Sequence, residues 1–171
     1  SWPRFHRIQS PLLDRLREAG VAPESIDIVL CTHLHVDHVG WNTRLQDGRW
    51  VPTFPNAKYL FSKIEHDFWD PGSNPNSRSA DEQAIYKDSV LPVVASEQAW
   101  LLEGAHAIED GLLVEPAPGH TPGHMILSIA AHQQRAILSG DVMHQPVQVY
   151  EPGWNSRFCE DATRARSTRR I

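Results

Sequence analysis

The 171-residue chain lacks the features that define several large classes of protein. It has only two cysteines, Cys31 and Cys159, which argues against a disulfide scaffold, and their separation does not fit a cysteine metal site. Its net charge of −5 gives no basic surface for nucleic acid. No apolar run is long enough to span a bilayer. We therefore expect a cytoplasmic protein with neither a nucleic-acid nor a membrane partner.

The chain does contain enough apolar residues for a hydrophobic core. They make up 40% of the sequence and include six tryptophans. A helix is predicted from Ser10 to a stop at Gly20, and a longer one over residues 80–102 with a kink or break at Pro92. Residues 41–55 read as irregular around an Asp47-Gly48 turn, and residues 70–79 as a polar loop. Strands are predicted over residues 26–31, 57–61, 112–117, 124–130 and 135–139. This order fits a sheet covered by helices.

The segment HLHVDH over residues 33–38 places three imidazoles and a carboxylate in six positions. It directly follows an apolar, β-branched run that is typical of a buried strand. His33 and His35 alternate by two and can point the same way, whereas Asp37 and His38 follow a turn and can face a second point. Buried together without a metal, these groups would repel one another or lack hydrogen-bond partners. The segment therefore predicts ligands for two metal ions.

Two later segments add donors of the same kind. Residues 118–124 read PGHTPGH, in which glycine and proline on both sides of His120 fix a tight loop. Residues 136–141 read AILSGD, an apolar strand whose tip presents Asp141. A carboxylate has two oxygens and can bridge two cations. Imidazole and carboxylate donors suit Zn, Fe, Mn or Ni.

At these residues the chain resembles the metallo-β-lactamase superfamily of metallohydrolases. Residues 32–38 are similar to its first metal motif, residues 119–124 to the loop with the next histidine ligand, and residues 139–141 to the strand end with the bridging aspartate. The resemblance implies an α+β fold, the αββα sandwich of that superfamily, in a single domain over residues 1–171.

The resemblance also implies two divalent metal ions, with zinc favoured and Fe, Mn or Ni as alternatives. The implied ligands are His33, His35 and His120 for one ion, Asp37 and His38 for the other, and Asp141 as the bridge. Two ions about 3.5–4 Å apart can hold a hydroxide between them and lower its pKa toward 7. Asp37 would also accept a hydrogen bond from that hydroxide. Hydrolysis by this route needs no serine or cysteine nucleophile.

Two departures from the superfamily pattern concern the ends of the chain. The superfamily usually has strands and an Asp-Thr-Gly-like turn before its first helix, but here a helix signal already begins at Ser10. It also has one more histidine well beyond the bridging aspartate, whereas the only histidine after Asp141 is His144. We therefore expect a sandwich that is incomplete at both ends, with the seventh ligand beyond Ile171. An uncovered sheet favours association, so a homodimer is among the expected states.

The motifs look most like the branch that contains homoserine-lactone lactonases and methyl-parathion-type phosphotriesterases. True β-lactamases of the superfamily generally lack the bridging aspartate, and its iron oxidoreductase branch has Glu in place of His35. The expected substrate is thus a small molecule with a lactone, ester or phosphotriester bond. Lactonases usually have Tyr where this chain has His144. His144 is interpreted either as a catalytic donor to the substrate or leaving group, or as a loop histidine.

Several assignments stay open from the sequence. His124 reads as a structural histidine of its loop, and Trp41, Phe54 and Trp69 as pocket walls or as core residues. The alternative functions are a thioester hydrolase similar to glyoxalase II and a mononuclear iron sulfur dioxygenase. A third alternative is an inactive metal-binding fragment with an incomplete second site. The number and identity of bound metal ions would separate the first two.

Overall fold

A computed structural model describes residues 10–74 and 79–170 of the chain. Its helices are α1 (Leu12–Glu18), α2 (Val36–Val39), α3 (Lys63–Trp69), α4 (Ala80–Ser89), α5 (Leu91–Ala95) and α6 (Ala162–Thr168), with short 3-10 turns at η2 (Pro23–Ser25), η3 (Gly140–Val142) and η4 (Pro146–Val149). Its strands are β1 (Ile28–Leu30), β2 (Thr43–Gln46), β3 (Arg49–Pro52), β4 (Lys58–Ser62), β5 (Ala99–Leu102), β6 (His106–Glu109), β7 (Leu112–Pro116), β8 (Met125–Ala131) and β9 (Gln134–Leu138). In these residues, no helix is both long and apolar enough to cross a membrane.

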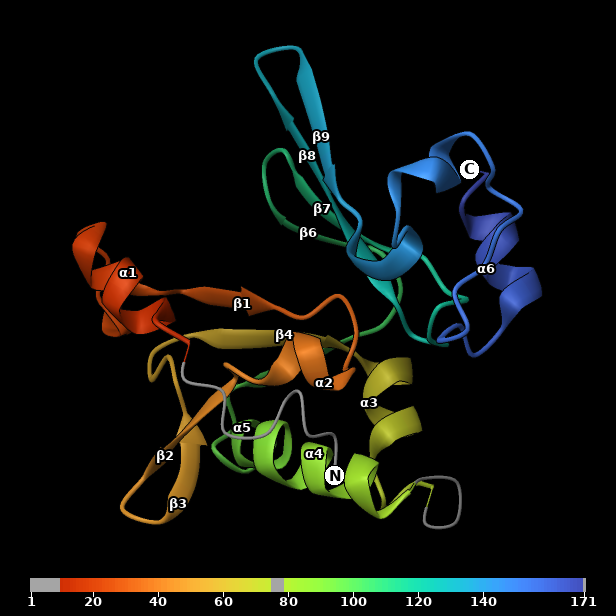
Figure 1. The fold of residues 1–171 in the computed structure, drawn as a ribbon. Helices are drawn as coiled ribbons and strands as arrows, with labels where there is room; N and C mark the ends of the chain where they lie inside the picture. Colours follow the sequence, from red (N-terminus) through yellow and green to blue (C-terminus); the bar gives the residue numbers. More distant parts are fainter. Residues whose placement is uncertain (1–9, 75–78, 171) are drawn as a thin grey trace.

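A three-stranded parallel sheet in the order β1-β4-β5 forms the middle of the molecule (Figure 1). Its central strand β4 is buried at every residue except Lys58. Parallel strands are usually covered on both faces, and the near-continuous apolar sequence of β4 agrees with this rule. Side chains of successive residues alternate between the two faces, so β4 contributes to two separate cores.

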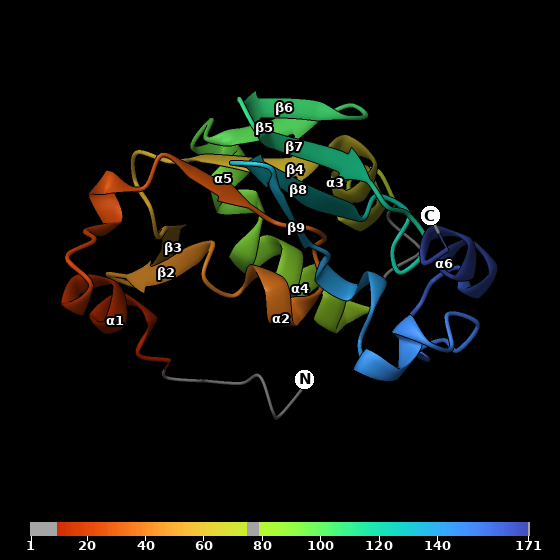
Figure 2. The ribbon, with the colours of Figure 1, turned by 90° about the horizontal axis from the view of Figure 1, so that it is seen from above.

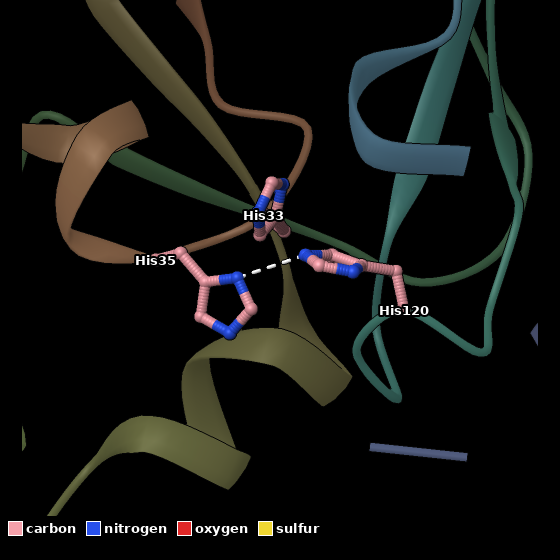
Figure 3. Close-up of side chains that lie close together, drawn as sticks. All are labelled: His33, His35 and His120. Atoms are coloured by element: carbon pink, nitrogen blue, oxygen red, sulfur yellow. Dashed lines mark hydrogen bonds between the residues drawn. The ribbon is translucent and has the colours of Figure 1, made fainter. Parts of the chain in front are cut away.

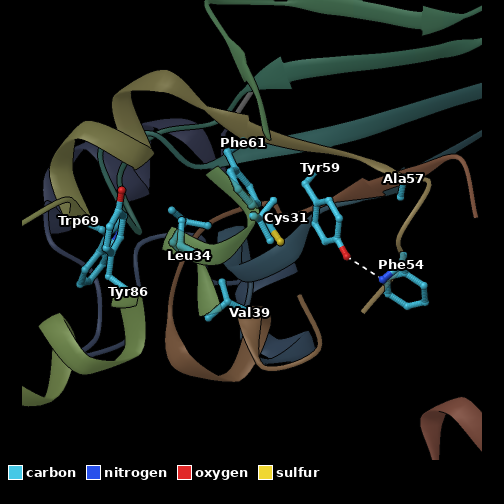
Figure 4. Close-up of a cluster of buried hydrophobic side chains, with 11 residues drawn as sticks. Cys31, Leu34, Val39, Phe54, Ala57, Tyr59, Phe61, Trp69 and Tyr86 are labelled. Atoms are coloured by element: carbon cyan, nitrogen blue, oxygen red, sulfur yellow. Dashed lines mark hydrogen bonds between the residues drawn. The ribbon is translucent and has the colours of Figure 1, made fainter. Parts of the chain in front are cut away.

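Helices cover one face of this sheet. Tyr59 and Phe61 of β4 point into a cluster with Val90 and Val93, which come from the region of α4 and α5 (Figure 4). The Tyr59 hydroxyl is buried and accepts a hydrogen bond from the backbone N–H of Phe54 at 2.9 Å. Cys31 also belongs to this cluster, as a small buried residue.

An antiparallel sheet in the order β6-β7-β8-β9 covers the other face. Figure 2 shows the strands of this second sheet lying over β4 and β5. Leu60 of β4 and Leu102 of β5 pack with Val114 and Met125 of the second sheet in a smaller core. The molecule therefore has a helix layer, a parallel sheet and an antiparallel sheet, an α+β arrangement as predicted. The opposite face of β7 and β9 is exposed, with Ile137 at 60% accessibility.

Several local predictions are wrong. Residues 41–55 contain the hairpin β2-β3 around the predicted Asp47-Gly48 turn. The helix predicted over residues 80–102 does break beside Pro92, into α4 and α5, but its last part is strand β5 instead. Pro92 lies at the start of α5, where it costs no hydrogen bond, and Glu97 in the left-handed region (φ 60°) turns the chain into β5. Ser10 does not cap α1, whose N-cap is Pro11.

The remaining differences are omissions and small shifts. Helix α3 and strand β6 were not predicted, and both matter for the layers described above. The predicted strands over residues 26–31, 57–61, 112–117, 124–130 and 135–139 correspond to β1, β4, β7, β8 and β9. Part of the predicted polar loop, residues 75–78, lies outside the described residues, as does residue 171.

Candidate metal centre

His33 and His35 lie just beyond the C-terminal end of β1, where ligands of parallel sheets commonly bind. His33 is fully buried. Its Nδ1 is 3.1 Å from the hydroxyl of Thr32, but its buried Nε2 has no hydrogen-bond partner in the described residues. A buried polar atom without a partner is costly, so this nitrogen fits a position where a metal ion would be its partner.

Three imidazoles converge at this point. One ring nitrogen from each of His33, His35 and His120 lies within 4.8 Å of the others. His120 Nε2 is 2.8 Å from His35 Nδ1, although the two residues are 85 positions apart (Figure 3). Burial lowers the pKa of His35 to about 4 and that of His120 to about 3, and it also lowers the pKa of His33. All three are therefore neutral at pH 7, which is the form that binds metal. We call these three residues the imidazole group.

A second group of possible ligands combines His33 with His38 and Asp141. His38 Nε2 is 3.3 Å from Asp141 Oδ1, and Asp141 Oδ2 is 3.5 Å from His120 Nε2. Asp141 therefore faces the ligands of both predicted ions, as a bridging carboxylate must. Asp37 is less close: its Oδ2 is 4.0 Å from His38 Nε2, and it joins none of the ligand groups found in the described residues.

His38 and Asp141 differ from the imidazole group in their electrostatics. Burial lowers the pKa of His38, but the hydrogen bond and charge of Asp141 outweigh burial and raise it above its usual value. Burial raises the pKa of Asp141, but His38 and the neighbouring imidazoles outweigh it and bring it to about 2. In the metal-free protein, each of these two groups thus favours the charged form of the other. We call His38, Asp141 and Asp37 the carboxylate group.

His144 also approaches Asp141. Its Nε2 lies 3.2 Å from Asp141 Oδ2, and its ring centroid is 4.8 Å from that of His120. Neither ring nitrogen of His144 has a hydrogen-bond partner with acceptable geometry in the described residues. His120, Asp141 and His144 form a third group that could hold an ion. The geometry thus allows a ligand role for His144 beside the catalytic role expected from the sequence.

His124, which the sequence indicated as structural, supports Asp141 directly. It is fully buried, and its Nε2 accepts a hydrogen bond from the backbone N–H of Asp141 at 3.1 Å. Burial lowers the pKa of His124 to about 4, so the ring is neutral and can accept. Gly140 has a φ of 50°, and a Cβ there would lie 2.8 Å from His124 Nε2. A glycine is therefore needed for Asp141 to approach the histidines this closely.

A cavity of about 430 Å³ opens onto both groups. One part of its wall is mainly apolar and consists of Leu34, Val36, Trp69, Ile85, Tyr86 and Val90. Polar candidates also reach it, namely His35, Asp37, His120, Asp141 and His144. Of the three aromatic residues considered from the sequence, Trp69 lines this cavity, Phe54 lies in the core, and Trp41 is not part of the cavity wall. The apolar part of this lining suits the hydrocarbon portion of a small molecule, and Glu82, Arg157 and Glu160 add charged groups to the wall.

Sequence reasoning missed Glu65, which is 1% exposed and lies directly behind the histidines. A signal was present, because Ser62 and Glu65 have the S-x-x-E spacing that marks the start of a helix. That spacing predicts α3, but it gives no indication that the carboxylate contacts the metal-binding loops.

The comparison with protein families agrees with this geometry. Residues 3–168 match the metallo-beta-lactamase superfamily. The chain belongs to this superfamily. The fold brings its motif residues together in the ligand groups described above, except Asp37, which lines the cavity but joins none of these groups.

Individual relatives support the assignment. YobT of Bacillus subtilis (strain 168) is 33% identical over 113 residues, which are 66% of this chain and 44% of that protein. An N-acyl homoserine lactonase of Bacillus thuringiensis is 23% identical over 127 residues, covering 74% of this chain and 42% of the relative. The solved structure of AbOPH, a hydrolase in the beta lactamase superfamily, aligns with a TM-score of 0.77 and 28% identity, over 93% of this chain and 56% of that one. The chain thus spans about half the length of these relatives.

Proposed function

We propose that this chain carries the metal centre of a hydrolase that opens lactone, ester or phosphotriester bonds of small molecules. The observation that carries the proposal is the imidazole group beside the cavity, with the buried, unpartnered Nε2 of His33 at its centre. Membership of the metallo-beta-lactamase superfamily supports hydrolysis. The name of the Bacillus thuringiensis relative favours a lactone among the three bond types.

The donor set fits two divalent ions, with zinc as the first choice. The imidazole group would hold one ion, the carboxylate group the other, and Asp141 both. When bound, such ions would supply a water nucleophile at neutral pH and would polarise the carbonyl or phosphoryl oxygen of the substrate.

The residues around the ions have separate roles in this proposal. Asp37 lines the cavity and would accept a hydrogen bond from the attacking water, which orients it. His144 lines the same cavity and would donate a proton to the departing oxygen. The apolar wall around Trp69 would hold the rest of the substrate and exclude bulk water from the reacting bond.

The test is metal-dependent hydrolysis by the 171-residue chain and by the protein as its gene encodes it. Both are stripped with a chelator, reloaded with Zn²⁺, and assayed with an N-acyl homoserine lactone, an aryl ester, an aryl phosphotriester and a thioester. We expect activity with one of the first three that disappears on stripping and returns with zinc. Activity that survives stripping, or a thioester as the only substrate, contradicts the proposal.

His144→Ala tests the role of that residue separately. A catalytic donor predicts unchanged metal content by elemental analysis and a lower kcat, with the largest loss for the substrate with the poorest leaving group. Loss of one ion per chain would instead make His144 a ligand, as its distance to Asp141 allows. His132→Asn is the matched control, because His132 is an exposed turn residue (φ 49°) between β8 and β9, and Asn tolerates this conformation.

A further inference from the structure

Glu65 occupies an unusual position for a carboxylate. It lies in the first turn of α3, is 1% exposed, and has no Lys or Arg partner among the ion pairs of the described residues. Its Oε1 accepts hydrogen bonds from the backbone N–H of Leu34 at 3.1 Å and from the indole N–H of Trp69 at 2.6 Å. Its Oε2 accepts from the backbone N–H of Gly123 at 3.0 Å. Burial raises the pKa of Glu65, and the Thr121 side chain, followed by the Leu34, Trp69 and Gly123 donors, offsets part of that effect.

The two backbone donors come from the two loops that carry the imidazole group. Leu34 stands between His33 and His35, and Gly123 stands between His120 and His124 in sequence. One carboxylate, which is not itself part of the cavity wall, therefore joins segments that are almost ninety residues apart. The third donor, Trp69, extends this support because its ring contacts the ring of His35 at a centroid distance of 5.3 Å.

A second S-x-x-E pair in the chain shows what Glu65 does differently. Ser79 and Glu82 at the start of α4 form a reciprocal capping box, in which Glu82 accepts from the backbone N–H of Ser79 at 2.8 Å. At α3, Ser62 accepts from the backbone N–H of Glu65, but the Glu65 carboxylate does not return to Ser62. It is directed at the ligand loops instead. Helix capping alone does not account for burying this charge, since an exposed glutamate caps equally well.

Gly123 gives independent evidence for a close contact between the loop at residues 120–124 and α3. A Cβ on Gly123 would overlap the backbone nitrogen of Glu65 and lie 2.7 Å from its Cα. Only glycine lets the loop come near enough for its N–H to reach the carboxylate. The close approach and the hydrogen bond thus serve the same contact.

We infer that Glu65 is a positioning residue of the metal centre, which holds the loop at residues 33–35 and the loop at residues 120–124 in the one relative arrangement that lets His33, His35 and His120 share an ion. The inference rests on the proposed function in so far as that function places an ion on these histidines. Glu65 touches neither the ion nor the substrate, so its effect is on the geometry of the ligands. Groups that orient ligands typically contribute about 10–100-fold to metal affinity.

Glu65→Gln is the direct test, because it keeps the size of the side chain and replaces one acceptor oxygen by an NH₂ donor. That NH₂ must face either the Gly123 N–H or the Leu34 and Trp69 donors, and the facing loop is released. We expect the affinity for the first Co²⁺ or Zn²⁺ ion, measured by competition with a chromophoric chelator, to fall about tenfold or more. The d–d absorption of the Co²⁺ form should also change, which reports altered ligand geometry independently of activity.

Glu115→Gln is the matched control. Glu115 on β7 accepts a hydrogen bond from the Ser128 hydroxyl at 2.6 Å, away from the ligand loops. The substitution makes the same chemical change at a hydrogen-bonded carboxylate that contacts neither Leu34 nor Gly123, and it should leave metal affinity and the Co²⁺ spectrum as in the wild type. Thermal unfolding of the metal-free proteins shows how far each change acts on stability alone.

The outcomes are distinct. If Glu65→Gln folds and binds Co²⁺ with wild-type affinity and spectrum, Glu65 is structural only and the inference is wrong. If Glu65→Gln does not fold, Trp69→Phe decides: it removes one donor and keeps an aromatic ring, and its affinity must fall by a smaller factor. Unchanged affinity in Trp69→Phe then contradicts the inference. If the wild-type chain itself binds no divalent ion, the proposed function fails and this inference fails with it.

Discussion

The imidazole group and the carboxylate group lie side by side, yet they differ in the burial and in the charge of their side chains. The imidazole group is built from two buried residues and one partly buried one, all neutral at pH 7 because burial lowers their pKa values. In the carboxylate group, Asp37 is half-exposed and His38 lies 3.3 Å from Asp141, whose charge raises the pKa of His38. An ion entering the first group meets neutral imidazoles, whereas one entering the second must compete with the contact between His38 and Asp141.

One short motif, residues 33–38, thus contributes to two candidate sites that differ in burial and charge. Residues 33–38 contribute to both groups, but His33 follows β1 and is buried, while α2 carries His38 to Asp141 and Asp37 to the cavity wall. Glu65 and Gly123 support the imidazole group from behind through backbone contacts. The carboxylate group is held by the hydrogen bond from the Asp141 N–H to His124 and by the hydrogen bond from the His38 N–H to the carbonyl of His35, and in the described residues no buried carboxylate joins its segments. We therefore expect the imidazole group to be the tighter site.

The largest expected effect follows from removing a ligand of the tighter site. His120→Ala should lower the affinity for the first ion by more than about 100-fold, since even losing a group that only orients a ligand costs about 10–100-fold. Competition with a chelator measures this affinity, with His132→Asn as the control. A loss no larger than that of the control would show that His120 is not a ligand.

Asp141→Ala should weaken both ions, and the second one more. Asp141 is within 3.5 Å of both His38 and His120, so its removal opens the carboxylate group and leaves the imidazoles in place. We expect the affinity for the second ion to fall about tenfold or more, and the affinity for the first ion to fall less. The scale is that of groups that orient metal ligands, whose loss costs about 10–100-fold in affinity. Elemental analysis after dialysis against dilute chelator measures the result. Full retention of metal would remove Asp141 from the site.

Metal removal should destabilise the fold mainly through the imidazole group. A ligand at 100 times its Kd stabilises the native state by about 2.7 kcal/mol. For a chain of this size that corresponds to a Tm lower by roughly 5–10 °C after chelation. His120→Ala should lose most of this shift, and Asp141→Ala should keep most of it. The reverse order, seen by differential scanning calorimetry, would mean that the carboxylate group holds the stabilising ion.

The smallest expected effect concerns the two thiols. Cys31 is buried in the core, whereas Cys159 lies at the cavity. Cys31 follows β1 and is 5% exposed, and burial raises its pKa to about 12. Cys159 lines the cavity, with its Sγ 3.8 Å from His120 Nδ1. At pH 8 a thiol reagent should modify Cys159 slowly and leave Cys31 intact until the protein unfolds. Modification of Cys31 in the folded protein would show that the end of β1 opens readily.

The sequence indicated which segments meet at the candidate metal centre because their signals are local. An apolar strand followed by HLHVDH, and a histidine between glycines and prolines, each carry their own evidence. The strands β1, β4, β7, β8 and β9 were predicted for the same reason, since each is an apolar run of strand length. These features need no knowledge of the rest of the fold.

The errors arose where contacts between residues far apart in sequence determine the local structure. Residues 99–102 were assigned to a helix, but they pair with β4 across the sheet as β5, a partner that the local pattern does not reveal. Glu65 was overlooked because its partners, Leu34 and Gly123, are 31 and 58 residues away in sequence. The position of Asp37 apart from the ligand groups depends on how α2 turns, which spacing alone does not fix.

The central claim is that the imidazole group fills before the carboxylate group. The most direct test is a titration of the metal-free chain with Zn²⁺, followed through the histidine side-chain signals by NMR and assigned with the His38→Ala and His120→Ala variants. The account predicts that His33, His35 and His120 respond to the first equivalent and His38 only to the second. If His38 responds first, or if all four respond together from the start, the two groups are not the unlike sites described above.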